Sequence, residues 1–243
     1  MVSKNQIKLI TSLQQKKYRI ANQMFFAEGI KAVNELLTSN FELVNIYTTL
    51  NDFTSVPSDK KTIISESDLK KISALATPNT CLAVFYMPAE KPIISSGLIV
   101  ALDSIRDPGN MGTIIRLCDW FGVEQILCSK ETVDIYNPKV VQATMGSITR
   151  VNVSYIDLVS YLSTVTIPVF GTFMDGENIY QSSLPSEGII VMGNEANGIS
   201  KEIESTVKSR LSIPRFGTVQ KTESLNVATA TGIILSEFKR NFL

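Results

Sequence analysis

Three polar segments in the second half of the chain carry side chains that could bind or activate a polar ligand. RDPGNMGTIIRLCDWFG contains Asn110 and, six residues later, Arg116; GNEANG contains Glu195; TESLNVATATG contains Ser224 and Asn226. Amide, hydroxyl and carboxylate groups of this kind hold ligands through hydrogen bonds. The start of a helix near Ser224 would add backbone N–H donors, because the first N–H groups have no partner within the helix. A simple N-cap role for Ser224 is the alternative.

The residue types that the chain lacks exclude several kinds of catalytic and metal site. The chain of 243 residues has no histidine, which excludes Ser-His catalysis and histidine-ligated metals. Its three cysteines, Cys81, Cys118 and Cys128, form no CxxC pair, so we expect no metal centre and a reducing compartment. With no signal peptide and no apolar stretch of membrane length, the sequence predicts a cytoplasmic protein without a membrane partner.

The elements around these segments alternate between strands and helices. The apolar strands are expected in GLIVALDS, EQILCS, TRVNVSY, IPVFGTFM, GIIVMGNE and RLSIP, with helical stretches between most of them. This alternation predicts an α/β domain with a parallel sheet that helices cover on both faces. Because the polar loops follow strands, we expect them to meet at the carboxyl edge of that sheet.

Residues 1–90 predict a smaller α/β domain. Helices are expected over residues 5–15, near Ile30 to Leu37, and from Ser65 onward; strands are expected in FFAEG, FELVNIYTT and CLAVFYM. The stretch MPAEKPIISSG is typical of a linker. The predicted division is therefore a first domain over 1–90, a linker over 91–97 and a second domain over 98–243.

The N-terminal segment concentrates positive charge although the whole chain has a net charge of zero. Residues 1–31 contain a single acid, Glu28, and six basic residues, among them Lys16, Lys17 and Arg19. Two interpretations stay open: a solvated helix face, or a patch in which these three side chains contact the phosphates of a ligand.

The glycines of GNEANG do not form a known phosphate-binding loop. No Gly-Lys-Ser/Thr follows them, and the chain has no GxGxxG segment, so a cofactor held by its phosphates is disfavoured. A plain turn is one interpretation of this segment. Arg116 also has a simple alternative, an ion pair with Asp119 or a side chain that extends to solvent from an apolar helix.

Taken together, the three motifs resemble the SpoU (TrmH-like) branch of the SPOUT RNA methyltransferases. The Asn followed six residues later by Arg, the Gly-x-Glu-x-x-Gly and the Ile-Pro … Ser-Leu-Asn-Val occur here in the order of that family. The resemblance spans roughly residues 97–243. Residues 1–90 resemble the small α/β substrate-binding domain that often precedes it.

The resemblance implies a fold, a cofactor and an activity. The family fold contains a deep trefoil knot, and its members act as homodimers with an active site that both subunits build. The implied reaction transfers a methyl group from S-adenosyl-L-methionine to a ribose 2′-hydroxyl in ribosomal or transfer RNA. The implied cofactor-binding residues are Gly193, Ile213 and Leu225, with Gly171, Thr172, Asn194, Gly198 and Pro214 beside them.

The resemblance also assigns catalytic roles. Arg116 would activate the hydroxyl, either as a base or by binding the adjacent phosphate and stabilising alkoxide charge; a guanidinium stays protonated, which favours the second role. Asn110 would hold the ribose, Glu195 the cofactor loop, and Ser224 and Asn226 the hydroxyl.

Two departures from the family pattern concern the last motif. Residues 214–224 form a longer stretch than is usual, with residues 220–222 as apparent additions, and Arg215 stands where many members have an apolar residue. A base-modifying SPOUT enzyme and a non-catalytic RNA-binding protein with this fold remain the alternatives.

Overall fold

The structure is a computed structural model that describes residues 2–219 and 224–240 of the chain. The chain forms two compact units. One contains residues 1–90 together with 134–149, and the other contains residues 91–133 and 150–243. The apparent insertion at residues 220–222 lies outside the described residues.

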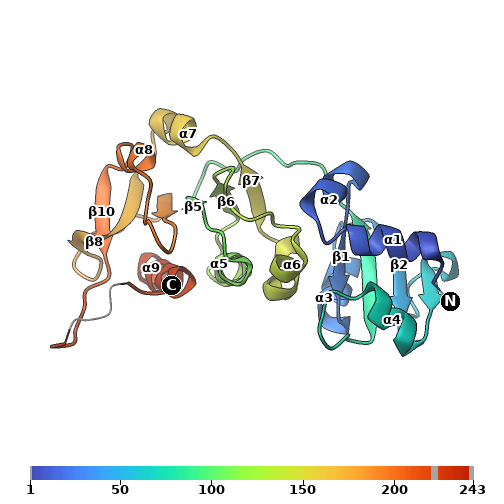
Figure 1. Ribbon diagram of the computed structural model, residues 1–243. Coiled ribbons are helices and arrows are strands. Elements are labelled where there is room, and N and C mark those ends of the chain that lie inside the picture. Colours follow the sequence, from blue (N-terminus) through green and yellow to red (C-terminus); the bar gives the residue numbers. More distant parts are fainter. Residues whose placement is uncertain (1, 220–223, 241–243) are drawn as a thin grey trace. The chain divides into compact units, whose positions relative to one another are not determined.

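The second unit is built on a parallel sheet of six described strands (Figure 1). All five pairings in the order β10-β8-β9-β5-β6-β7 are parallel. Helices α5 and α9 pack together on one face and α7 and α8 pack together on the other (Figure 1). The elements are β5 (Leu98–Leu102), α5 (Pro108–Trp120), β6 (Gln125–Cys128), β7 (Asn152–Tyr155), α7 (Leu158–Thr164), β8 (Val169–Asn178), β9 (Gly188–Met192), α8 (Lys201–Glu204), β10 (Ser209–Ser212) and α9 (Val227–Lys239).

Apolar patterning explains this arrangement. Every residue of β5, β6 and β9 is buried, as expected for strands with a helix layer on each side. On one face, Leu158 and Leu162 of α7 and Ile203 of α8 pack onto Ile99 and Val191 of the sheet. The predicted α/β fold class is therefore confirmed. The trefoil knot is what the family resemblance implies for this domain.

Three loops leave the carboxyl edge of this sheet and position the site. They connect β5 to α5, β9 to α8, and β10 to α9. Because the three strands run in parallel, their carboxyl ends lie at one edge. These are the three polar segments of the sequence, and hydrogen bonds between them confirm that they meet.

The first unit has a mixed sheet in the order β1-β4-β2-β3. Strand β4 is antiparallel to β1 and β2, whereas β3 is parallel to β2. Ser65 caps α4, because its side chain accepts from the N–H of Asp68 at 3.2 Å. The elements are α1 (Lys4–Ser12), α2 (Lys16–Asn22), β1 (Met24–Glu28), α3 (Ile30–Leu37), β2 (Leu43–Thr48), η1 (Ser58–Lys60), β3 (Lys61–Ile63), α4 (Glu66–Ile72) and β4 (Cys81–Tyr86).

Residues 134–149 complete the first unit although they lie far beyond it in sequence. This segment contains α6 (Pro138–Thr144) and η2 (Ser147–Thr149), and α6 packs against β1. The Tyr136 ring lies 4.7 Å from that of Phe25. Asp134 pairs with Arg19, which also donates to the carbonyl oxygens of Leu13 and Gln14. The predicted division into 1–90, 91–97 and 98–243 does not assign residues 134–149 to the first unit. Long-range contacts place them there, and composition does not reveal such contacts.

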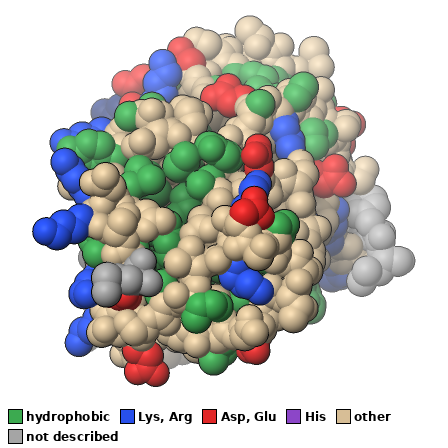
Figure 2. All heavy atoms as spheres, turned by 90° about the vertical axis from the view of Figure 1, so that its right-hand side faces the viewer, with side chains coloured by type: hydrophobic (Ala, Val, Ile, Leu, Met, Phe, Trp, Pro, Cys, Tyr) green, Lys and Arg blue, Asp and Glu red, His purple; other side chains and the backbone are tan. Residues whose placement is uncertain are grey.

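The predicted RNA contact at Arg19 is therefore wrong. The side chain is 2% exposed, and its guanidinium is committed to Asp134 and two backbone carbonyls. Lys16 and Lys17 of the same helix are exposed. Figure 2, which views the molecule from the right-hand side of Figure 1, shows lysine and arginine side chains gathered along one edge of that face.

Candidate active site

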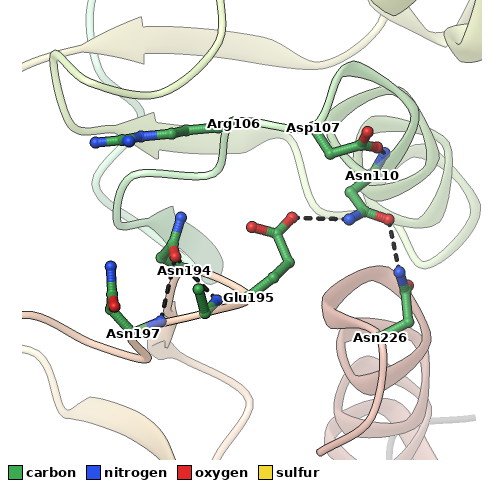
Figure 3. A pocket seen from close by; sticks show the side chains of 8 residues that line it. Arg106, Asp107, Asn110, Asn194, Glu195, Asn197 and Asn226 are labelled. Carbon is green, nitrogen blue, oxygen red and sulfur yellow. Dashed lines mark hydrogen bonds between the residues drawn. The ribbon is translucent and has the colours of Figure 1, made fainter.

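A polar cavity of about 660 Å³ opens at the carboxyl edge of the six-stranded sheet. A chain of hydrogen bonds crosses it and joins all three loops (Figure 3). Asn226 donates from Nδ2 to Asn110 Oδ1 at 2.8 Å, and Asn110 donates from Nδ2 to Glu195 Oε1 at 2.7 Å. The structure therefore brings together three of the five predicted catalytic residues.

Helix caps place two of these side chains. Asp107 caps α5 by accepting from the N–H of Asn110 at 2.7 Å, which sets Asn110 in the first turn. Asn226 caps α9, because its Oδ1 accepts from the N–H groups of Ala228 and Thr229 at 3.0 and 3.2 Å. These bonds fix which end of the Asn226 amide faces the helix, so Nδ2 is left for Asn110. One residue thus both starts the helix and belongs to the site.

The GNEANG segment is a tight turn as well as part of the site. Backbone hydrogen bonds of 2.8 and 2.9 Å join Asn194 and Gly198, and Asn194 Nδ2 donates to the carbonyl of Ser104 at 2.7 Å. Gly198 has a φ of 69°, and a Cβ on Gly193 would lie 2.3 Å from the backbone of Gly198. The glycines are required for this close approach, and the turn places the Glu195 carboxylate within hydrogen-bond distance of Asn110.

A second cavity of about 580 Å³ lies beside the polar one. Residues 194–196 line both cavities, so the two spaces meet across the GNEANG turn. Apolar side chains such as Met192, Leu211 and Ile234 form much of its wall. Its lining includes seven of the eight predicted cofactor residues together with Ser224: Thr172, Gly193, Asn194, Gly198, Ile213, Pro214 and Leu225. Gly171 lies on β8 within the sheet.

Ionic contacts support one wall of this apolar cavity. Phe173 lines it, and the Arg210 guanidinium carbon lies 3.5 Å from the centre of the Phe173 ring. Arg210 also pairs with Asp175 at 2.6 Å, and this hydrogen bond lowers the pKa of the Asp175 carboxyl. The cationic side chain of Arg210 therefore connects β10 to Asp175 of β8 next to the cavity.

The apolar cavity fits S-adenosyl-L-methionine in size and chemistry. Its volume lies within the range of roughly 300–1,000 Å³ that is usual for small-molecule sites. The walls combine apolar side chains with the exposed backbone of a glycine turn, and the cofactor carries no phosphate that would need a dedicated loop. When bound, this cofactor would supply an electrophilic methyl group.

Arg116 stands apart from both cavities. It is exposed on α5 and, within the described part of the chain, is not among the residues that line either space. The alternative partner Asp119 pairs with Arg150 at 2.9 Å. In one subunit, therefore, the site that contains Asn110, Glu195 and Asn226 does not include the predicted activating arginine.

Sequence reasoning missed four residues that line the polar cavity, namely Ala196 and the polar residues Arg106, Asp107 and Asn197. Arg106 and Asp107 directly precede the proline of the first motif, and Asn197 lies within GNEANG. Their positions in polar loops after strands were the available signal, but loop position alone does not show which side chains face a cavity.

The fold and the two cavities define a class: an α/β enzyme with its ligand site at the carboxyl edge of a parallel sheet. Residues 97–236 match the SpoU rRNA Methylase family, and residues 4–83 match the MRM3-like substrate binding domain. The chain belongs to the SpoU rRNA Methylase family. The predicted activity, methyl transfer from S-adenosyl-L-methionine to a ribose 2′-hydroxyl of RNA, is thereby confirmed as that of its family.

Individual relatives agree with this assignment. The 23S rRNA (guanosine(2553)-2′-O)-methyltransferase RlmP of Bacillus subtilis is 31% identical, with 96% of each chain covered. An RNA methyltransferase structure of the TrmH family from Porphyromonas gingivalis is 40% identical with a TM-score of 0.91, and 99% of each chain is covered. The AdoMet-bound rRNA methyltransferase of Sinorhizobium meliloti is 28% identical with a TM-score of 0.88, covering 100% of this chain and 98% of its own.

Two features are absent from the described residues, a membrane-spanning helix and a cluster of metal ligands. Of the helices described, none has the length and apolar character to cross a bilayer. Nor do the described residues contain a group of three or more histidine, cysteine, aspartate or glutamate side chains suited to a metal ion.

Proposed function

We propose that this chain methylates the ribose 2′-hydroxyl of a guanosine in 23S ribosomal RNA, with S-adenosyl-L-methionine as the methyl donor. The observation that carries the proposal is the shared wall at residues 194–196, which places an apolar cavity of cofactor size beside a polar cavity. The choice of ribosomal RNA is supported by RlmP and by the RlmB relative of Neisseria meningitidis, which is 34% identical over 59% of this chain.

The residues of the polar cavity suit a sugar hydroxyl. The Asn110 and Asn226 amides provide donors and acceptors, and Glu195 provides an acceptor, so together they can orient the hydroxyl and its neighbour. Ser224, at the entrance to α9, lines the adjoining cavity and offers a further hydroxyl. These groups position the nucleophile, and the gain in rate would come mainly from orientation and from stabilising the charge that develops on oxygen.

Arg116 enters this proposal through a second subunit. Since it is exposed on α5 outside both cavities of its own chain, a homodimer would bring it to the partner's site, as the family resemblance implies. A groove between α5 and α9, lined by Leu117 and Gly232 among others, and the 84% exposed Trp120 support an interface on this face. There Arg116 would bind phosphate or stabilise the alkoxide.

The first unit would recruit the RNA. The exposed Lys16 and Lys17 on α2 are its proposed phosphate contacts, and the match to a substrate-binding domain supports this role. The three cysteines are free and buried, which suits a reducing compartment, and we propose a cytoplasmic location.

The test is methyl transfer to RNA from cells in which the gene is deleted. With tritiated S-adenosyl-L-methionine, 23S ribosomal RNA from the deletion strain should accept label, whereas RNA from the parent strain should not because its site is already modified. Nucleoside mass spectrometry should identify 2′-O-methylguanosine. Label on a base would support the base-modifying alternative, and absence of any transfer would support the non-catalytic one.

A further inference from the structure

Arg106 is the one basic residue that lines the polar cavity in the described part of the chain. It follows β5 in the loop before α5 and is exposed. The two acids of the same cavity already have partners, because Asp107 caps α5 and Glu195 accepts from Asn110. A lone guanidinium among amides and committed carboxylates therefore provides the positive charge of this cavity.

The charges of the cavity are separated in space. In Figure 3, Arg106 extends away from the Asn110–Glu195 hydrogen bond and lies across the cavity from Asn194 and Asn197. The Asn194 amide is occupied within the turn, since its Oδ1 accepts from the N–H groups of Ala196 and Asn197. The Asn197 side chain also lines the cavity. One end thus carries the Arg106 guanidinium and the Asn197 amide, and the other carries the Glu195 carboxylate.

We propose that Arg106 and Asn197 form a subsite for a phosphodiester group of the RNA strand, next to the ribose that is methylated. The inference rests on the proposed function. Every internal ribose of an RNA strand has a phosphate on each side, and a guanidinium binds phosphate oxygens through two parallel hydrogen bonds. The carboxylate end repels a phosphate, so the subsite would fix the direction in which the strand enters.

This role differs from that of the other arginine. Arg116 lies outside the cavities of its own chain, whereas Arg106 lines the polar cavity within a single subunit. Arg106 would therefore be a positioning residue for the substrate and would have no contact with the cofactor cavity, whose lining does not include it.

The experiment compares Arg106→Gln and Arg106→Lys with Lys208→Gln. Lys208 is an exposed cation directly before β10, at the amino end of a parallel strand and thus at the opposite edge of the sheet. For each full-length variant we would measure affinity for 23S ribosomal RNA from the deletion strain at several salt concentrations, kcat/KM for methyl transfer, and the Kd of S-adenosyl-L-methionine.

Arg106→Gln should lower kcat/KM for the RNA about ten- to a hundredfold, the loss expected for one charge-assisted hydrogen-bonded contact. It should also reduce the slope of log affinity against log salt by about 0.7, the contribution of one phosphate on a single strand. Arg106→Lys should keep the slope but lose part of kcat/KM. The Kd of the cofactor should remain within about twofold, because the side chain lies outside that cavity.

The inference is overturned if Arg106→Gln matches Lys208→Gln in slope and in kcat/KM, or if cofactor affinity falls together with RNA affinity. Failure of the proposed function has a different signature: the unchanged protein would then transfer no methyl group to the RNA. In that case the salt slopes of RNA affinity still decide whether Arg106 contacts a phosphate.

Discussion

Asn226 combines a structural and a chemical role that two substitutions can separate. Its Oδ1 caps α9, while its Nδ2 donates to Asn110 at 2.8 Å. Asn226→Ala removes both functions. Asn226→Asp retains the acceptor that caps the helix but replaces the amide donor by a second carboxylate oxygen.

The expected magnitudes follow from these contacts. Loss of an N-cap costs about 1 kcal/mol, so Asn226→Ala should lower Tm by about 2–4 °C in a chain of this size. Asn226→Asp should melt at or slightly above the parent temperature, because a carboxylate at a helix N-terminus contributes about 0.3–1 kcal/mol. Both variants should lose methyl transfer by about 10²–10³, since Asn110 Oδ1 loses its donor and the chain to Glu195 is disrupted.

Calorimetry and initial rates on unmodified 23S ribosomal RNA test this separation, with Lys208→Gln as the matched control. An Asn226→Asp protein that melts normally and methylates at the parent rate would refute the argument that the hydrogen-bond chain orients the substrate. An Asn226→Ala protein of unchanged Tm would refute the capping argument.

Three further predictions concern other parts of the molecule. Arg19→Met should destabilise the protein by about 3 kcal/mol or more in urea unfolding, because it leaves the Asp134 charge without its partner. The double variant Arg19→Met with Asp134→Asn should recover much of this loss. Equal stabilities of the single and double variants would contradict this pairing. Burial raises the pKa of the Glu28 carboxyl above its usual 4.5. The free energy of unfolding of the parent, relative to that of Glu28→Gln, should therefore fall as pH rises from 4.5 towards neutrality. Parallel pH profiles for the two proteins would contradict this prediction. Arg116→Ala and Asn110→Ala should each lose methyl transfer by about 10²–10³. A mixture of the two should recover about a quarter of the parent rate if the site spans two subunits, whereas no recovery would place both residues in one subunit's site.

The second unit was more predictable than the first. Six continuous apolar strands separated by mostly helical stretches allow few arrangements, and a parallel order places the loops after β5, β9 and β10 at one edge. In the first unit the short helix α2 and the three-residue strand β3 carry little periodicity, and neither was predicted.

For individual side chains, burial and long-range pairing limit what the sequence alone can predict. Arg19 and Lys17 lie two residues apart on one helix, but only Arg19 turns inward to Asp134, which is 115 residues away. Composition identifies both only as positive charge. The same limit applies to Arg106, because its place in the polar cavity depends on where the Glu195 turn and α9 meet the start of α5.

The proposed function places cofactor and ribose in two cavities on either side of residues 194–196. The most direct measurement is a calorimetric titration of S-adenosyl-L-methionine into Asn110→Ala, paired with its rate of methyl transfer. A Kd within about twofold of the parent value together with a rate reduced by about 10²–10³ is the predicted result. A cofactor affinity that falls in proportion to the rate would contradict the claim, because Asn110 would then belong to the cofactor site.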